Sequence, residues 1–126
     1  MKKTEVQFKK DMMVIVNRFI PILLLQRHTF ELERNAEGDN SNAFMLCTFN
    51  YPYLNVTIKY SQKAFQEWRN GKDMTPYIVH EMCHPITDPL YAKSTSRWST
   101  HDEIKDEREN LTDLICNIVL KLTDRA

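Results

Sequence analysis

The hydrophobic pattern of this chain changes its period twice, and this limits the folds open to it. Apolar residues between about Glu5 and Leu25 recur at helical spacing. Three segments then alternate as strands do, namely His28 to Arg34, Ala43 to Tyr51 and Tyr53 to Tyr60. Helical spacing returns after Ser61. This order predicts an α+β domain, in which helices cover a small, mainly antiparallel, three-stranded sheet.

Capping residues and prolines set the expected ends of the later helices. Ser61 is a candidate N-cap for a short helix, and Asp73 can cap the next one. That next helix is expected to run from about Met74 to His84 and to stop at Pro85, because proline lacks the amide donor of a helix interior. A loop is then expected up to Thr100, followed by a last helix from about Asp102 to Leu122.

Length and charge limit the functions open to the chain. Its 126 residues suit one domain, residues 1–126, and 17 basic and 17 acidic side chains cancel to a formal net charge of zero. Binding to nucleic acid through bulk positive charge is therefore not expected. The uninterrupted apolar run Phe19 to Leu25 is too short to span a bilayer. Three widely spaced cysteines indicate reduced thiols, so we expect a cytoplasmic protein without membrane or nucleic-acid partners.

One five-residue segment carries specific chemistry. His80, Glu81 and His84 form the pattern H-E-x-x-H in a predicted helix. Residues four apart lie on the same helix face, so both imidazoles can bind one metal ion, and Zn²⁺ is the expected cofactor. Glu81 lies about 100° further round the helix, which suits a base that acts on a zinc-bound water. One alternative is a structural zinc site without an open position for water, in which Cys83 is a further ligand. The plainest alternative is a surface helix that carries these residues by chance.

A catalytic zinc ion usually needs a third protein ligand and an open position for water. Positions 87 and 90 lack the Gly and His of the metzincin pattern, which excludes that class. The predicted last helix resembles the gluzincins, the thermolysin-like zinc metallopeptidases, because Glu109, Thr112 and Asp113 fit their E-x-x-[ST]-D arrangement. The resemblance implies that Glu109 is the third ligand and that Asp113 accepts a hydrogen bond from the ring of His80.

The resemblance to gluzincins covers roughly residues 74 to 120. Arg108 departs from it, since the family usually has Asn just before the ligand Glu. The chain is also similar to small bacterial and phage-borne proteins that contain little more than this catalytic half.

A helical wheel of the last helix leaves the third ligand open. One apolar stripe contains Leu111, Leu114, Ile115, Ile118, Val119 and Leu122. Glu107 lies with that stripe, whereas Glu109 and Asp113 lie nearly opposite. Glu109 can face zinc if the helix is buried on two sides, but Glu107 is the better ligand if only the stripe is buried. Asp88 and His101 are weaker candidates.

Together these features predict a zinc metallopeptidase, or a closely related amide hydrolase, that acts on a peptide or protein substrate. An oxyanion donor is expected from His101, Tyr77 or Tyr91, with His101 first because it just precedes the ligand helix. The resemblance implies that the substrate pairs with an edge strand, here Leu54 to Tyr60. The rival hypotheses are a metallopeptidase-like binding protein without turnover and a structural zinc domain that uses Cys83.

Overall fold

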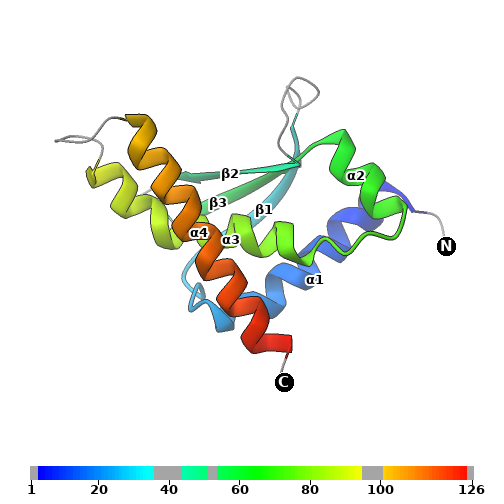
Figure 1. Ribbon diagram of the computed structural model, residues 1–126. Coiled ribbons are helices and arrows are strands. Elements are labelled where there is room, and N and C mark those ends of the chain that lie inside the picture. Colours follow the sequence, from blue (N-terminus) through cyan, green and yellow to red (C-terminus); the bar gives the residue numbers. More distant parts are fainter. Residues whose placement is uncertain (1–2, 36–43, 51–53, 95–100, 125–126) are drawn as a thin grey trace.

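A computed structural model describes residues 3–35, 44–50, 54–94 and 101–124 (Figure 1). The elements are α1 (Glu5–Ile22), β1 (Thr29–Arg34), β2 (Met45–Asn50), β3 (Asn55–Tyr60), α2 (Gln62–Arg69), α3 (Thr75–Ser94) and α4 (His101–Asp124). The predicted α+β class and the order helix, three strands, helices are confirmed. None of the helices in these described segments is long and apolar enough to cross a membrane.

The three strands form one mixed sheet in the order β1-β3-β2. β1 runs parallel to β3, and β2 runs antiparallel to it. The expectation of a mainly antiparallel sheet therefore holds for only one of the two strand pairs. β3, the last strand in the sequence, therefore lies between β1 and β2. Leu54 to Tyr60 is thus not the edge strand that we expected, and β2 is the edge strand that packs against α3.

Two of the predicted caps are confirmed. The side chain of Ser61 accepts a hydrogen bond from the Ala64 amide at 3.1 Å and begins α2. Asp73 Oδ1 accepts from the Thr75 amide at 3.0 Å and satisfies one of the free donors at the start of α3. The start of α3, which carries the H-E-x-x-H segment, is therefore fixed by a local interaction.

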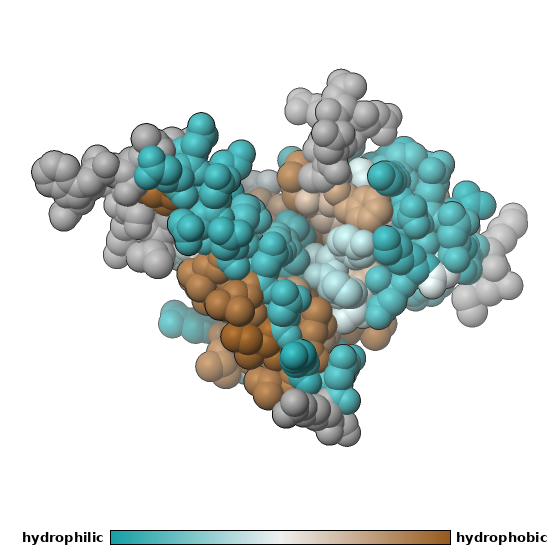
Figure 2. Space-filling view, viewed as in Figure 1, coloured by the Kyte–Doolittle hydropathy of each residue, from teal (hydrophilic) through white to brown (hydrophobic). Residues whose placement is uncertain are grey.

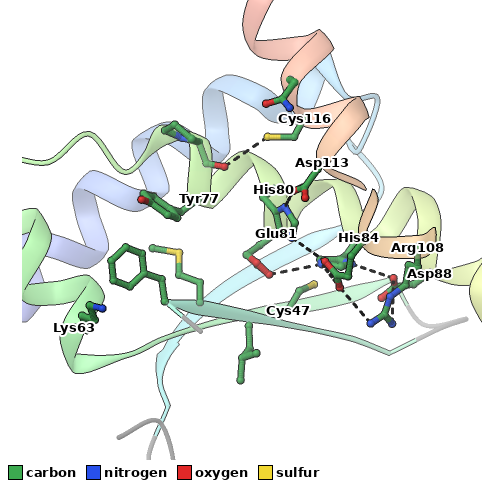
Figure 3. A pocket seen from close by; sticks show the side chains of 16 residues that line it. Cys47, Lys63, Tyr77, His80, Glu81, His84, Asp88, Arg108, Asp113 and Cys116 are labelled. Atoms are coloured by element: carbon green, nitrogen blue, oxygen red, sulfur yellow. Dashed lines mark hydrogen bonds and ion pairs between the residues drawn. The ribbon is translucent and has the colours of Figure 1, made fainter. Parts of the chain in front are cut away.

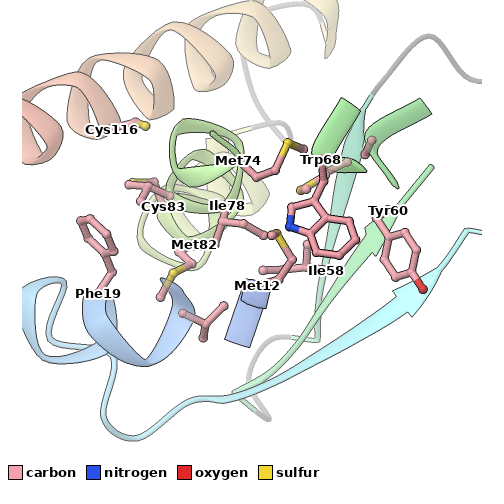
Figure 4. Packing of buried hydrophobic residues seen from close by; sticks show 14 of the residues in the cluster. Met12, Phe19, Ile58, Tyr60, Trp68, Met74, Ile78, Met82, Cys83 and Cys116 are labelled. Atoms are coloured by element: carbon pink, nitrogen blue, oxygen red, sulfur yellow. The ribbon is translucent and has the colours of Figure 1, made fainter. Parts of the chain in front are cut away.

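The core lies between the sheet and helices α1 and α3 (Figure 4). α1 buries four residues at helical spacing, namely Phe8, Met12, Val16 and Phe19. Alternate residues of β3, namely Val56, Ile58 and Tyr60, are also buried. From α3 the core receives Ile78, Met82 and Cys83, which are fully buried. This packing fixes which side of α3 is left to form a site.

Helix α3 continues to Ser94, well beyond its predicted end, with Pro85 and Pro89 inside it. Each proline removes one amide donor and costs about 3 kcal/mol in a helix interior. Tertiary packing opposes that cost, because Pro85 and Thr87 are buried and Thr87 Oγ1 hydrogen-bonds Thr112 Oγ1 of α4 at 2.9 Å. The predicted loop is therefore wrong up to Ser94, and residues 95–100 lie outside the described residues.

Helix α4 packs on α3 along the side that carries Thr112 and Cys116, both of which are buried. We expected the apolar stripe of α4 to lie in the core, but only two of its residues, Ile115 and Val119, are partly buried. The other members of the stripe, Leu111, Leu114, Ile118 and Leu122, are exposed. Burial of the stripe, which would have favoured Glu107 as a ligand, is therefore not what the structure shows.

Candidate metal centre

His80 and His84 lie on the side of α3 that faces away from the core residues Ile78 and Met82, and together with Glu81 they line a pocket (Figure 3). His80 and His84 are one helical turn apart, and their ring centroids are 5.0 Å apart. Possible ligand atoms of His80, Glu81 and His84 all lie within 4.8 Å of one another. This cluster could hold a metal ion, as the spacing in the sequence predicted.

Helix α4 brings a second carboxylate, that of Glu109, to the same place. Glu109 Oε2 lies 3.3 Å from His80 Nε2, and its Oε1 lies 3.7 Å from His84 Nε2. Glu107, the alternative ligand, is exposed on α4 and does not line the pocket. The structure therefore places Glu109, rather than Glu107, beside both imidazoles.

A carboxylate stands behind each imidazole. His80 Nδ1 is 2.7 Å from Asp113 Oδ1, the partner that the gluzincin resemblance implied. His84 Nδ1 is 3.1 Å from Asp88 Oδ1. An Nδ1–H group that donates to a carboxylate leaves the Nε2 lone pair of the same ring free to bind a metal ion. Both Nε2 atoms lie next to Glu109, so the hydrogen bonds and the candidate ligands agree on one position.

Asp88 has a role that the sequence analysis missed. It was considered only as a weaker ligand in a predicted loop, whereas the structure places it in α3, four residues after His84. The signal was the i, i+4 spacing, which brings side chains together only if the helix continues through Pro85. The predicted helix end therefore concealed this contact.

A pair of threonines keeps α3 and α4 in register at the site. Thr112 is fully buried, and its hydroxyl donates to the Arg108 carbonyl at 2.8 Å besides its contact with Thr87. Because Thr112 lies between Glu109 and Asp113 in the sequence, this contact fixes the part of α4 that supplies both carboxylates.

Acidic groups outnumber basic ones around the two imidazoles. Glu81, Asp88, Glu109 and Asp113 converge there, and Arg108 lies 3.9 Å from Asp88 Oδ1 and 3.3 Å from Glu109 Oε1. Burial raises the pKa of Glu81 to about 8; the nearby His84 opposes this rise, and the other carboxylates add to it. Burial favours the neutral form of Glu81, whereas the four converging carboxylates are the groups that favour an added cation at this position.

The same charges act on His84 in the opposite sense to its burial. Burial disfavours the charged imidazolium and by itself lowers the pKa. The hydrogen bond to Asp88 and the nearby carboxylates of Glu81, Asp88 and Glu109 outweigh burial, so the pKa of His84 is raised. The surroundings of His84 therefore favour a positive charge on its ring.

The pocket has a volume of about 710 Å³ and extends away from the histidines along β2. Its described lining includes Phe44, just before that strand, and the first strand residues Met45, Leu46 and Cys47. Tyr77 also lines it, and its ring lies edge-on to that of Phe44 at a centroid distance of 4.9 Å. A cleft with a polar cluster at one side and apolar walls along a strand suits an extended ligand.

Cys83 does not join the candidate ligands. Its side chain lies in the hydrophobic core, where burial raises the pKa of the thiol to about 12 (Figure 4). Cys116 lines the pocket, but its thiol lies 3.6 Å from the Pro76 carbonyl in a weak hydrogen bond. A protonated thiol is a poor metal ligand, so the structure gives the structural zinc hypothesis no support from Cys83.

The remaining candidates have different positions. His101 is the first residue of α4 and Tyr91 lies in α3, but their side chains are outside the described residues. Tyr77, the third candidate donor, is described and lines the pocket one turn before Glu81. Among the described side chains, Tyr77 is thus the one expected oxyanion donor that shares the pocket with the histidines.

The fold and the site define a small α+β protein with a candidate metal centre between two packed helices. Two imidazoles, each held from behind by a carboxylate, and a further carboxylate beside them form a donor set that suits zinc and other divalent transition metals. No family model, curated protein or solved structure matches this chain. The chemistry of the site is therefore the basis for assigning a function.

Proposed function

We propose that the protein is a zinc-dependent hydrolase, most simply a metallopeptidase that cleaves peptide bonds. One observation carries the proposal. His80 and His84 are each oriented by a carboxylate, so both turn Nε2 toward Glu109, with the buried carboxylate of Glu81 alongside. This arrangement supplies ligands and a neighbouring base without filling every coordination position.

His80, His84 and Glu109 would hold the zinc ion. Zinc, when bound, supplies a Lewis acid that lowers the pKa of water to about 7. Glu81 is the group positioned to accept a proton from the attacking water and to pass it to the leaving amine. Its pKa of about 8 in the chain alone would fall next to a divalent cation, because positive charge favours the ionised carboxylate. Glu81 would then be ionised near neutral pH, as a base must be.

The edge of β2 is the surface that would orient an extended peptide. The Ser61 amide donates to the Phe44 carbonyl at 3.0 Å, and hydrogen-bonded pairs alternate along an antiparallel ladder. The backbone groups of Met45 and Cys47 therefore point away from β3, toward the open edge. A substrate strand could pair with these groups beside the candidate metal centre. β2 thus takes the role that the sequence analysis gave to Leu54 to Tyr60.

The test compares zinc content and cleavage in three purified proteins. Wild type, Glu81→Gln and the control Glu107→Gln are expected to bind one zinc ion per chain, measured by mass spectrometry of the metal. Cleavage of a mixed peptide library should fall by about 100-fold or more in Glu81→Gln, because general-base catalysis contributes about that much, and should stay normal in Glu107→Gln.

Each other outcome contradicts the proposal in its own way. Zinc binding without cleavage of any peptide would indicate a binding protein built on a peptidase-like site. Loss of zinc in Cys83→Ser, with the fold retained by circular dichroism, would indicate a structural zinc site. Absence of zinc from wild type would remove the basis of the proposal.

A further inference from the structure

The outer face of α4 carries an exposed apolar stripe. Leu111, Leu114, Ile118 and Leu122 are 39%, 57%, 49% and 62% exposed. Their spacing of three, four and four residues puts them on one side of the helix. Figure 2 shows this apolar surface along the C-terminal half of α4, where it meets a strip of hydrophilic residues. Single exposed leucines are ordinary, but a continuous row on one helix is typical of an interaction surface.

The stripe is separate from the candidate metal centre. Glu109 and Asp113 lie on the side of α4 that turns toward His80, whereas Leu111 and Leu114 point elsewhere around the helix. None of the four stripe residues lines the pocket. A partner that covers the stripe would therefore leave the pocket open.

The charges at the two ends of the stripe indicate what covers it. Glu107 lies one turn before Leu111, and Lys121 lies beside Leu122; both charged side chains are exposed. A second α4 that runs antiparallel brings the acidic end of one stripe to the basic end of the other. A parallel arrangement would place like charges opposite each other. Antiparallel packing also opposes the two helix dipoles favourably, and a net charge of zero gives no overall repulsion between copies.

We propose that the protein forms a symmetric dimer through the stripe of α4, with the two helices antiparallel. Four half-exposed aliphatic side chains per copy form a patch of roughly the size found at weak interfaces, below about 1,200 Å² in total. The dimer is therefore expected to be reversible, with a dissociation constant in about the micromolar range or weaker. Both pockets remain accessible in it.

Sedimentation equilibrium over a concentration series, from about one micromolar to about one millimolar, measures the dissociation constant. Wild type is expected to shift from monomer to dimer within this range. Leu114→Glu and Ile118→Glu should each remain monomeric, because each buries a charge at the contact. Val14→Glu is the matched control, since Val14 is 68% exposed on α1, and it should dimerise as wild type does.

Charge reversal tests the antiparallel arrangement separately. Glu107→Lys and Lys121→Glu should each weaken the dimer, roughly two- to tenfold. The double variant restores opposite charges in an antiparallel pair and should return the dissociation constant to the wild-type value. A wild type that stays monomeric throughout, a dimer insensitive to Leu114→Glu, or a double variant as weak as the singles would overturn the proposal. Circular dichroism of every variant shows that the fold is retained.

Discussion

The two aspartates behind the imidazoles decide which ring nitrogen each histidine offers. An ionised carboxylate can accept hydrogen bonds but cannot donate them. Its contact with Nδ1 therefore fixes the ring proton on that nitrogen in His80 and His84. Asparagine can present its NH₂ group instead and favour the wrong tautomer. We therefore expect Asp88→Asn and Asp113→Asn each to weaken zinc binding by about 10- to 100-fold.

Competition with a coloured chelator measures that affinity. Asp124→Asn, at the exposed C-terminal end of α4, is the control and should bind zinc as wild type does. Unchanged affinity in both Asp88→Asn and Asp113→Asn would mean that the two hydrogen bonds do not orient the ligands.

His28, far from the site in the sequence, makes a separate contribution to stability. Its ring lies 5.7 Å from that of Phe49, and burial lowers its pKa. The unfolded chain then binds more protons at this group, so stability is full above the unfolded pKa of about 6.5 and falls as the pH drops through it. His28→Phe keeps the aromatic contact without a titrating group.

The expected result is a smaller loss of stability in His28→Phe than in wild type between about pH 7.5 and about pH 5.5. Urea denaturation at each pH measures it. The difference between the two proteins isolates His28, because the other titrating groups are shared. Parallel curves would contradict the lowered pKa.

The local sequence pattern was sufficient to predict that the histidines and the glutamate of H-E-x-x-H lie together, but it did not predict which residues surround them. His80, Glu81 and His84 lie in one helical turn, so their spacing alone predicts that they cluster. The partner of His84 was lost because Pro85 was interpreted as a helix end, and proline in a helix is tolerated only where packing on another element offsets its cost. That packing comes from α4, which no local pattern could reveal.

Long-range pairing set the other limit. The strand segments were recognised from alternation, but the order β1-β3-β2 depends on contacts between residues distant in the sequence. Likewise, the apolar stripe predicted the wrong buried side for α4, because the helix packs on α3 through Thr112 and Cys116 instead. Periodicity shows that a helix has an apolar side; it does not show whether the same chain covers it.

The prolines inside helix α3 give a test of this balance between the local cost of proline and the packing that offsets it. Pro89 leaves the Pro85 carbonyl without its usual amide donor. Pro89→Ala restores that donor, so we expect it to stabilise the fold by about 1–3 kcal/mol. Pro76→Ala, in the first turn where the amide has no helical partner in any case, should change stability little. Urea denaturation compares both with wild type, and a destabilised Pro89→Ala would show that the proline ring itself is needed for packing.

The edge of β2 can be tested through its backbone. Cys47→Pro removes an amide that points to the open edge, so it should raise KM for peptides several-fold and leave zinc bound. Cys47→Ala keeps the amide and should have a normal KM, which separates the backbone from the thiol. Thr48→Pro removes an amide that faces β3 and should lower the melting temperature instead. Equal KM values for the proline and alanine variants at position 47 would exclude pairing at this edge.

The candidate metal centre lies between two packed helices and draws side chains from both. His80 and His84 come from α3 and Glu109 from α4, so a bound ion would link both helices in the folded state only. A ligand that binds only the folded state raises the free energy of unfolding by about 2.7 kcal/mol when its concentration is 100 times its dissociation constant. For a chain of this length that corresponds to a rise in melting temperature of roughly 10 °C.

Differential scanning fluorimetry with added zinc measures this rise. The melting temperature of wild type should rise with zinc but not with magnesium, because magnesium prefers oxygen ligands and keeps its water shell. His84→Ala should gain nothing from zinc, whatever its own starting temperature, because one ligand is missing. Glu81→Gln should respond as wild type does, since Glu81 is proposed to act on water rather than to hold the ion. A zinc response that survives in His84→Ala would place the metal elsewhere in the molecule and separate stability from the proposed hydrolysis.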